Sequence, residues 1–140
     1  MNLTKDQILI RFNEWLKAWD EYDLDAVMEF IHDDVLFENW NGITVSGRTA
    51  LQKLWTPWFV FNGNFKFSKE DIFVDEQEQK IIFQWLFDGP TFEKGFKGKS
   101  ENRRGIDVVH LVDGKIYKKL CYSKTNIQID SEPVLLMAIK

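Results

Sequence analysis

The sequence contains little cysteine, histidine and proline, and it contains no long apolar run. Among its 140 residues are one cysteine, two histidines and three prolines. Cys121 therefore cannot form an internal disulfide, and His32 and His110 lie too far apart in the sequence to form a metal-ligand cluster. No apolar run approaches the roughly 20 residues of a membrane span. The apolar core of a signal peptide is missing from the first residues, MNLTKDQILIRF, so we expect a cytoplasmic protein.

Basic residues occur singly or in short pairs, and the formal net charge is −4. Nucleic acid is therefore not an expected partner. The sequence also lacks a glycine-rich phosphate loop and a Ser-His-Asp arrangement. We expect no cofactor, no metal and no membrane contact.

Aromatic residues are abundant, at 15% of the chain with six Trp and twelve Phe. A chain of this length is typical of one domain with one apolar core. So many large rings favour either a bulky core or an aromatic-lined cavity.

Helical periodicity predicts two helices in the first 34 residues. Thr4 followed by Gln7 has the spacing of a capping box, in which both side chains satisfy backbone donors of the first turn. Asp23 can cap a second, shorter helix that ends near residues 32–34.

The pattern then changes twice before residue 60. β-Branched and aromatic residues predict a strand at 35–40, which Asn41 and Gly42 should stop. A third helix is expected to begin after Gly47. Pro57 should kink or end it, because proline removes a backbone donor.

Strands dominate from residue 65 onward. The expected strands are separated by turn residues at 75–78, 88–90 and 113–114, and they cover 65–74, 79–87, 103–112 and 115–124. Asp113 and Gly114 supply the positive φ angles of a two-residue hairpin, so the last two strands should be antiparallel neighbours. The stretch 91–102 is either a flexible loop or the outer end of a long strand. Helices followed by antiparallel strands predict an α+β domain with its helices on one face of the sheet.

The tail, residues 130–140, ends in an apolar run. Asp130 and Ser131 are possible caps, and Pro133 lies near an expected helix start. An apolar terminus needs a cover, so it should fold over the sheet as a lid or pack on a second subunit.

Three segments together resemble the nuclear transport factor two-like superfamily. They are FNEWLKAWDEYDLDAVMEFIHDDVLFENWNG, SGRTALQKLW and GIDVVHLVDGKI, and the likeness covers roughly residues 4 to 125. The nearest branch is that of the SnoaL-like polyketide cyclases and ketosteroid isomerase. The resemblance implies one domain over 1–140, a cone-shaped α+β barrel in which three N-terminal helices pack on a strongly curved, mainly antiparallel sheet around a cavity. It also implies a homodimer through the outer sheet face.

This sequence has only part of the catalytic residues known from enzymes of this superfamily. In ketosteroid isomerase a carboxylate base works beside a tyrosine and a protonated aspartate. Asp107 falls at the position of that aspartate, whereas Asn39 falls at the base and Trp15 at the tyrosine, and neither side chain accepts a proton near neutral pH. Limonene epoxide hydrolase has an Arg two residues before a strand Asp, and Gly105 occupies that position here. Neither mechanism is therefore expected.

Strand alternation turns Asp107 and Val109 toward the expected cavity. Among aromatic rings a carboxyl shifts toward its neutral form unless a cation or donors lie beside it. Asp107 would then donate a proton or a hydrogen bond to a ligand oxygen. The alternative is a structural Asp107 held by Lys119, or by Arg103 or Arg104.

Other residues are candidates for ligand contact. Asn39 could fix a ligand carbonyl or a water, or be a satisfied polar group at a strand end. The remaining candidates, each of which could equally be core, are Trp15, Trp19, Phe37, Trp55, Trp58, Phe59, Phe83, Trp85, Val109 and Cys121.

The expected function is binding of a small, apolar, carbonyl-bearing ligand in an aromatic pocket. Proton transfer of the isomerase, cyclase or lyase type would use Asp107 as acid or hydrogen-bond donor. In place of the missing base, Asn39 would hold a water, or the protein would bind without catalysing. The alternative function is a non-catalytic, dimeric protein-interaction module whose cavity is filled as core.

Overall fold

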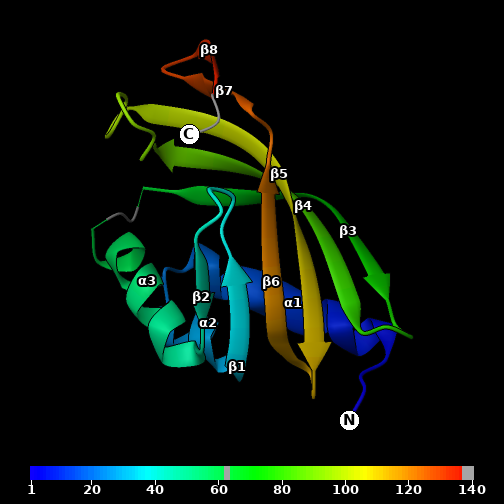
Figure 1. Cartoon of the computed structure of the whole chain (residues 1–140). Coiled ribbons are helices and arrows are strands. Elements are labelled where there is room, and N and C mark those ends of the chain that lie inside the picture. Colours follow the sequence, from blue (N-terminus) through cyan, green and yellow to red (C-terminus); the bar gives the residue numbers. More distant parts are fainter. Residues whose placement is uncertain (62–63, 137–140) are drawn as a thin grey trace.

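The computed structural model describes residues 1–61 and 64–136, which fold as three helices on one side of a curved sheet (Figure 1). The helices are α1 (Lys5–Asp20), α2 (Leu24–Glu29) and α3 (Arg48–Phe61). The strands are β1 (Ile31–Glu38), β2 (Thr44–Ser46), β3 (Lys66–Asp75), β4 (Lys80–Pro90), β5 (Ser100–Val112), β6 (Lys115–Ser123), β7 (Asn126–Ile129) and β8 (Glu132–Leu135). Within these described ranges no helix is long and apolar enough to cross a membrane.

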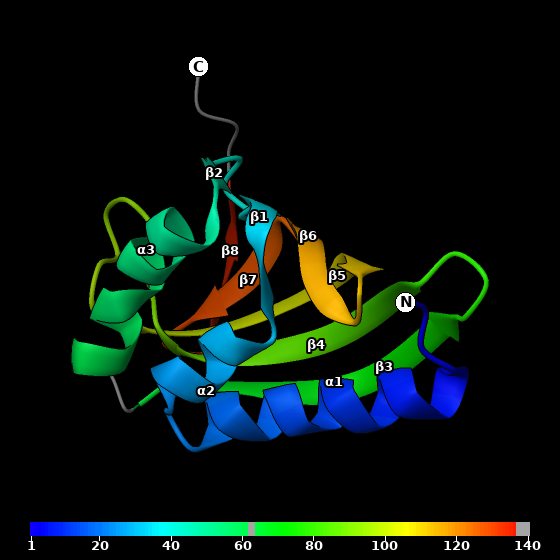
Figure 2. The ribbon, with the colours of Figure 1, turned by 90° about the horizontal axis from the view of Figure 1, so that it is seen from below.

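The sheet has the order β2-β1-β6-β5-β4-β3, and β7 adds to the outer end of β5. All pairings are antiparallel except that of β1 with β6. Register shifts interrupt three of the ladders, and such bulges increase the local bend and twist of a strand. The sheet consequently wraps around the interior as a half-barrel, with the helices closing its open side (Figure 2). This confirms the expected α+β cone.

Local signals account for the starts of the first two helices. The Thr4 hydroxyl accepts a hydrogen bond from the backbone nitrogen of Gln7 at 3.2 Å. The side-chain oxygen of Gln7 accepts one from the backbone nitrogen of Thr4 at 2.9 Å. The carboxylate of Asp23 accepts from the Ala26 nitrogen at 3.1 Å. The predicted capping box and the predicted cap are therefore confirmed.

The second helix ends earlier than predicted, at Glu29. Ile31 is fully buried and pairs in register with Ile116 of β6, whose nitrogen donates to the Phe30 carbonyl at 2.8 Å. The helical extension to residues 32–34 is wrong, because strand pairing with a segment far along the chain outweighs the local periodicity.

Pro57 does not end α3, which continues to Phe61. The hydroxyl of Thr56 donates to the Gln52 carbonyl at 2.6 Å within this turn. The apolar face of the helix packs on the core through Leu51 and Trp55, which are 0% and 5% exposed. This packing offsets the loss of one backbone donor.

The strand β4 is longer than predicted, since it runs through the expected turn at 88–90. Asp88, Gly89 and Pro90 pair in register with the start of β5. A side chain at Gly89 would collide with Phe65 and Phe87, so glycine here allows close packing and does not mark a turn. Residues 91–99 form a loop, and residues 100–102 belong to β5. The stretch 91–102 thus contains both expected conformations, a loop and the outer end of a long strand.

The tail forms a hairpin instead of the expected helix. β7 and β8 are joined at Asp130 and Ser131, whose φ angles of 50° and 66° are those of a tight turn. β7 extends the sheet by pairing with Glu101 and Asn102 of β5. Residues 137–140, the end of the tail expected to form a lid or a subunit contact, lie outside the described residues.

Candidate functional site

A cavity of about 80 Å³ lies inside the cone, between the inner face of the sheet and the helices α1 and α3. This volume is several times the roughly 10–15 Å³ that one water requires. Its walls are mostly apolar. The lining residues are Trp15, Leu16, Trp19, Phe37, Asn39, Trp40, Leu54, Trp55, Trp58, Phe67, Phe83, Trp85, Asp107, Lys119 and Cys121.

The structure brings most of the predicted site residues to this cavity. Phe59 and Val109 are not among the described residues that line it. Phe59 packs against Trp19 with ring centroids 5.0 Å apart, and Val109 is fully buried in the core. The other predicted residues all line the cavity.

Five lining residues were not among the predicted site residues. They are Leu16, Trp40, Leu54, Phe67 and Lys119. A signal for Lys119 was present, because Cys121 was expected to face the cavity and residues two apart on a strand share a face. Because lysine side chains are rarely buried, a lysine in a sequence is normally expected at the surface and not in a cavity wall.

Asp107 and Lys119 form an ion pair in the cavity wall. The Lys119 Nζ lies 3.0 Å from Oδ2 of Asp107, and the two side chains are only 11% and 5% exposed. The indole Nε1 of Trp85 donates to Oδ1 of Asp107 at 3.0 Å. Nζ of Lys119 also donates to Cys121 Sγ at 3.1 Å. The structural alternative named for Asp107, a bond to Lys119, is thus present.

Neighbouring strands bring this group together. Asp107 on β5 lies directly opposite Cys121 on β6, and Val109 lies opposite Lys119. On the other side of β5, Phe83 of β4 is the partner of Asp107. The carboxylate of Asp107 on β5 therefore lies beside two successive inward-facing residues of β6, Lys119 and Cys121.

The surroundings keep Lys119 protonated. Burial alone lowers the pKa of its ammonium, but the nearby Asp107 carboxylate and Cys121 outweigh this, and the pKa is raised overall. The ammonium also lies 5.2 Å from the ring centroid of Phe37 and 5.9 Å from that of Trp55, which places it over electron-rich faces. Lys119 is thus a cationic donor and not a nucleophilic amine.

Cys121 remains a neutral thiol. Burial raises the pKa of its thiol to about 12, although the neighbouring Lys119 acts in the opposite direction. A thiol is a weak nucleophile compared with its thiolate. The site therefore offers Cys121 as a small apolar contact.

Asp107 accepts hydrogen bonds at both of its oxygens, from Trp85 and from Lys119. A cation and an indole donor therefore both lie beside this carboxyl group. The donor on the cavity wall is Lys119, and Asp107 is the acceptor beside it. A catalytic role for Asp107 stays a prediction.

Asn39 lines the cavity just beyond the end of β1. Its Oδ1 accepts from the backbone nitrogen of Trp40 at 2.9 Å. Its own backbone nitrogen donates to the Ile43 carbonyl at 2.9 Å, which closes the turn between β1 and β2. Asn39 thus has the local hydrogen bonds of a strand end and also a place in the wall.

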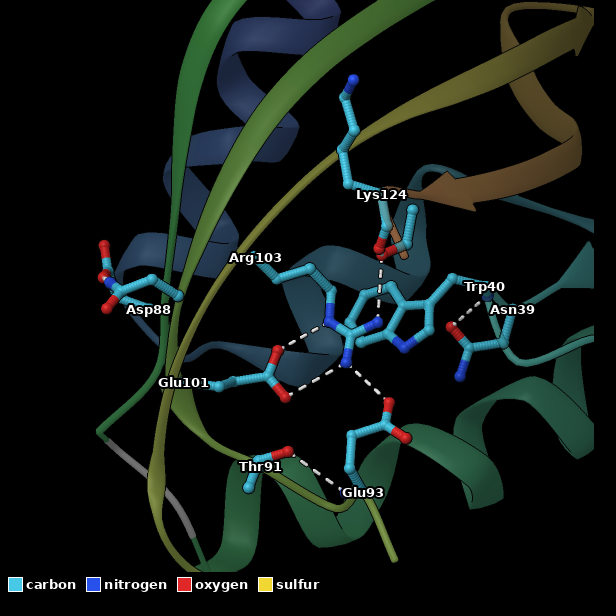
Figure 3. A network of polar contacts seen from close by, with 10 residues as sticks. Asn39, Trp40, Asp88, Thr91, Glu93, Glu101, Arg103 and Lys124 are labelled. Carbon is cyan, nitrogen blue, oxygen red and sulfur yellow. Dashed lines mark hydrogen bonds and ion pairs between the residues drawn. The ribbon is translucent and has the colours of Figure 1, made fainter. Parts of the chain in front are cut away.

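A second buried polar group lies beside the cavity, centred on Arg103 of β5 (Figure 3). The guanidinium contacts Glu101 with Nε–Oε2 at 2.7 Å, Glu93 with Nη2–Oε1 at 2.6 Å, and Ser123 Oγ at 3.0 Å. It also lies over the ring of Trp40, with Cζ 4.8 Å from the centroid. Since Trp40 lines the cavity, this network fixes one wall and ties down the 91–99 loop.

The two histidines lie away from the cavity. Nδ1 of His32 accepts from the Asp34 nitrogen at 3.0 Å. His110 is on the outer sheet face, where partial burial and the nearby Lys80 and Lys118 lower the pKa of its imidazole. Across residues 1–61 and 64–136, no three His, Cys, Asp or Glu side chains are grouped so that they could hold a metal ion.

A half-barrel sheet closed by three helices around an aromatic cavity defines an NTF2-like protein. The chain belongs to the SnoaL-like domain family, whose sequence profile matches residues 12–119. No curated protein matches the sequence.

Solved structures share this fold at low sequence identity. An LEH-like epoxide hydrolase from Mycobacterium tuberculosis is 17% identical, with a TM-score of 0.70 over 85% of this chain and 84% of that chain. The epoxide hydrolase/cyclase-like enzyme SalBIII, which acts in pyran ring formation in the polyether salinomycin, is 14% identical, with a TM-score of 0.75 over 89% and 97%. RV0760c from Mycobacterium tuberculosis, solved with estradiol-17beta-hemisuccinate, is 16% identical, with a TM-score of 0.69 over 83% and 92%. At these identities the likeness concerns the fold alone.

Proposed function

We propose that this protein binds a small apolar compound in the aromatic cavity and holds one carbonyl or enolate oxygen of that compound at Lys119. One observation carries the proposal: a buried ion pair, Lys119 with Asp107, lies in an otherwise mainly apolar cavity wall. The rings accommodate an apolar body, and the ammonium supplies the orienting polar contact. A cavity of about 80 Å³ also favours ligand binding over an interaction module with a filled core.

The ammonium of Lys119 has a hydrogen to spare for a ligand. It carries three N–H groups, of which Asp107 and Cys121 take two. A third bond to a carbonyl oxygen would polarise that carbonyl, and the low polarity of the aromatic walls would strengthen the interaction.

Asp107 is then the base and, afterwards, the acid of a proton transfer. A proton leaves the carbon next to the ligand carbonyl for the Asp107 carboxylate. The electron pair of that C–H bond forms a C=C bond, while the π pair of the C=O bond moves to the oxygen and gives an enolate. Lys119 stabilises the enolate, and Asp107 returns the proton to the same or another carbon. This is chemistry of the isomerase, cyclase or lyase type. Gly105 leaves the chain without the Arg expected for an epoxide hydrolase, which supports proton transfer instead.

The relatives support a ligand of this kind. One structure with the same fold was solved with a steroid ester and another with polyporic acid. Each of these ligands joins an apolar ring system to polar oxygens. The proposal extends only this general chemistry to the present chain.

A ligand screen and an exchange measurement test the proposal. Thermal unfolding is followed with aryl ketones and with hydrocarbons of the same shape, and we expect the ketones alone to raise Tm. Deuterium incorporation next to the ketone carbonyl in D₂O, followed by NMR, should occur with the wild type and be lost in Asp107→Asn. Lys118→Met, on the outer face, is the control. Equal Tm shifts from ketones and hydrocarbons would overturn the role of Lys119, and exchange that survives in Asp107→Asn would overturn that of Asp107.

The protein is also proposed to be a cytoplasmic homodimer that pairs through its outer sheet face. Phe73, Ile82, Val108 and Leu120 form a continuous cross-strand row on that face. Phe73 is 56% and Ile82 38% exposed, Val108 and Leu120 are half-buried, and an apolar row across four strands is suited to a second copy. The single, buried Cys121 is consistent with a reducing compartment.

A further inference from the structure

The indole of Trp19 carries an unpaired hydrogen-bond donor. In the part of the chain that the structure describes, its Nε1 is the only buried side-chain nitrogen or oxygen without a partner. Buried donors almost always have an acceptor, so such an exception calls for an explanation. Trp15 and Trp85, which are 2% and 1% exposed, follow the rule, since Trp15 donates to the Val27 carbonyl at 3.2 Å and Trp85 donates to Asp107.

The surroundings of Trp19 are aromatic. Its ring centroid lies 5.0 to 6.1 Å from those of Trp55, Phe59, Trp15, Phe67 and Phe65. None of these rings offers a lone pair to an N–H group. Trp19 is also a lining residue of the cavity. An acceptor for its donor can therefore come from a molecule held there.

Trp19 and Lys119 lie against the same side chain, Trp55. The ring centroids of Trp19 and Trp55 are 5.0 Å apart, and the Lys119 Nζ is 5.9 Å from the Trp55 centroid. The two donors come from different walls, one on α1 and the other on β6. A compound whose aromatic ring lies against Trp55 would therefore have both side chains beside it.

We infer that the ligand carries two acceptor oxygens at opposite ends of a flat apolar body, one held by Lys119 and the other by the indole N–H of Trp19. The inference rests on the proposed function and narrows its ligand class from compounds with at least one carbonyl group to dicarbonyl compounds, quinones or keto esters. Trp19 is a specificity residue, because a site with an unpaired donor favours the ligand that supplies the missing acceptor.

A matched pair of probes isolates the second oxygen. 1,4-Diacetylbenzene carries two carbonyl groups, and in 4-isopropenylacetophenone a CH₂ group replaces one carbonyl oxygen. Calorimetric titration should show that the wild type prefers the diketone by on the order of tenfold, the worth of one hydrogen bond to a buried donor. Trp19→Phe keeps a ring but removes the donor, so its preference should fall to near onefold. Tyr122→Phe also removes one polar hydrogen from a ring, but at a side chain that is 50% exposed on the outer sheet face, and it should retain the tenfold preference.

NMR of the indole protons gives a readout that needs no variant. The Trp19 indole proton should move downfield when the wild type binds the diketone, and it should move less with the isopropenyl compound. A preference that survives in Trp19→Phe, or a wild type without any preference, overturns the inference while the function proposed above stands. If neither probe nor any other ketone binds the wild type, both proposals fail together.

Discussion

Trp85 donates its indole N–H to Asp107 over 3.0 Å, and both side chains are buried. Trp85 lies directly opposite Gly105 in the β4–β5 ladder. A Cβ atom at Gly105 would overlap the six-membered ring of the indole and the backbone oxygen of Tyr122. The glycine two residues before Asp107 thus makes room for the ring that fixes one oxygen of this carboxylate.

Gly105→Ala should destabilise the protein and release Asp107 from Trp85. Overpacking a core costs about 1–3 kcal/mol, and we expect the upper end because the Tyr122 oxygen is backbone and cannot turn away. Urea unfolding measures the cost, and near-UV circular dichroism reports the displaced indole. Gly42→Ala is the control, since a Cβ there meets no atom within 4 Å and only the φ angle of 87° is unfavourable. Equal losses in the two variants would show that the indole does not need this space.

Removing one charge of the buried ion pair should cost more than removing both. Lys119→Met leaves Asp107 as an uncompensated buried charge, and such changes cost about 3–5 kcal/mol. In Lys119→Met with Asp107→Leu no unpaired charge remains, so we expect much of the stability to return. Urea unfolding of the two single variants and the double variant gives the coupling energy. A double variant as unstable as the sum of the singles would contradict a direct pairing of the two charges.

Stability should fall as pH rises above 9. The pKa of the buried Cys121 thiol is about 12, against 9.0 for an ordinary thiol, so the folded state retains a proton that the unfolded chain releases. The free energy of unfolding then decreases by about 1.4 kcal/mol per pH unit between these values. Lys119 acts in the same direction above its ordinary pKa of 10.5, since its pKa is raised in the folded state.

The window between pH 9 and 10.5 separates the two groups. Cys121→Ala should remove the loss of stability in this window and keep only the Lys119 contribution above it. The measurement is urea unfolding of the wild type and the variant at closely spaced pH values. If the wild type and Cys121→Ala lose the same amount of stability between pH 8 and pH 10, Cys121 is not a buried neutral thiol.

Local periodicity predicted the direction in which several of the site's side chains point. The two-residue repeat on β5 turned Asp107 inward, and the helical repeat did the same for Trp15 and Trp19. Both repeats follow from backbone geometry, so they hold whatever packs against the face.

The partners of these side chains depended on contacts between distant segments. The bond between Lys119 and Asp107 comes from the β5–β6 register, and the bond from Trp85 depends on a neighbouring glycine. The turn expected at 88–90 became strand because residues 100–102 pair with it. Tertiary pairing decides such cases, and a local propensity cannot anticipate it.

The two glutamates on Arg103 should differ in their effect on stability. Glu101 and Arg103 are 3% and 1% exposed, whereas Glu93 is 29% exposed. Glu101→Gln removes the buried charge partner and should cost about 3–5 kcal/mol. Glu93→Gln leaves the Glu101 pair intact, and water screens the lost contact, so about 1 kcal/mol or less is expected. Thermal and urea unfolding compare the two, and a larger loss for Glu93→Gln would reverse the assignment of the central ion pair.

A charge in the outer row should prevent dimer formation. Val108 lies between Ile82 and Leu120 in this row, and Val108→Glu would bury a carboxylate against its own copy at the proposed interface. Sedimentation velocity should give the mass of one 16.6 kDa chain for this variant and of two chains for the wild type. Phe92→Glu is the control, because Phe92 is 56% exposed on the 91–99 loop, away from the sheet face, and its replacement should leave the dimer intact. A dimer that persists in Val108→Glu would mean that the copies meet at another surface, since two facing glutamates in an apolar interface repel each other and lose their hydration.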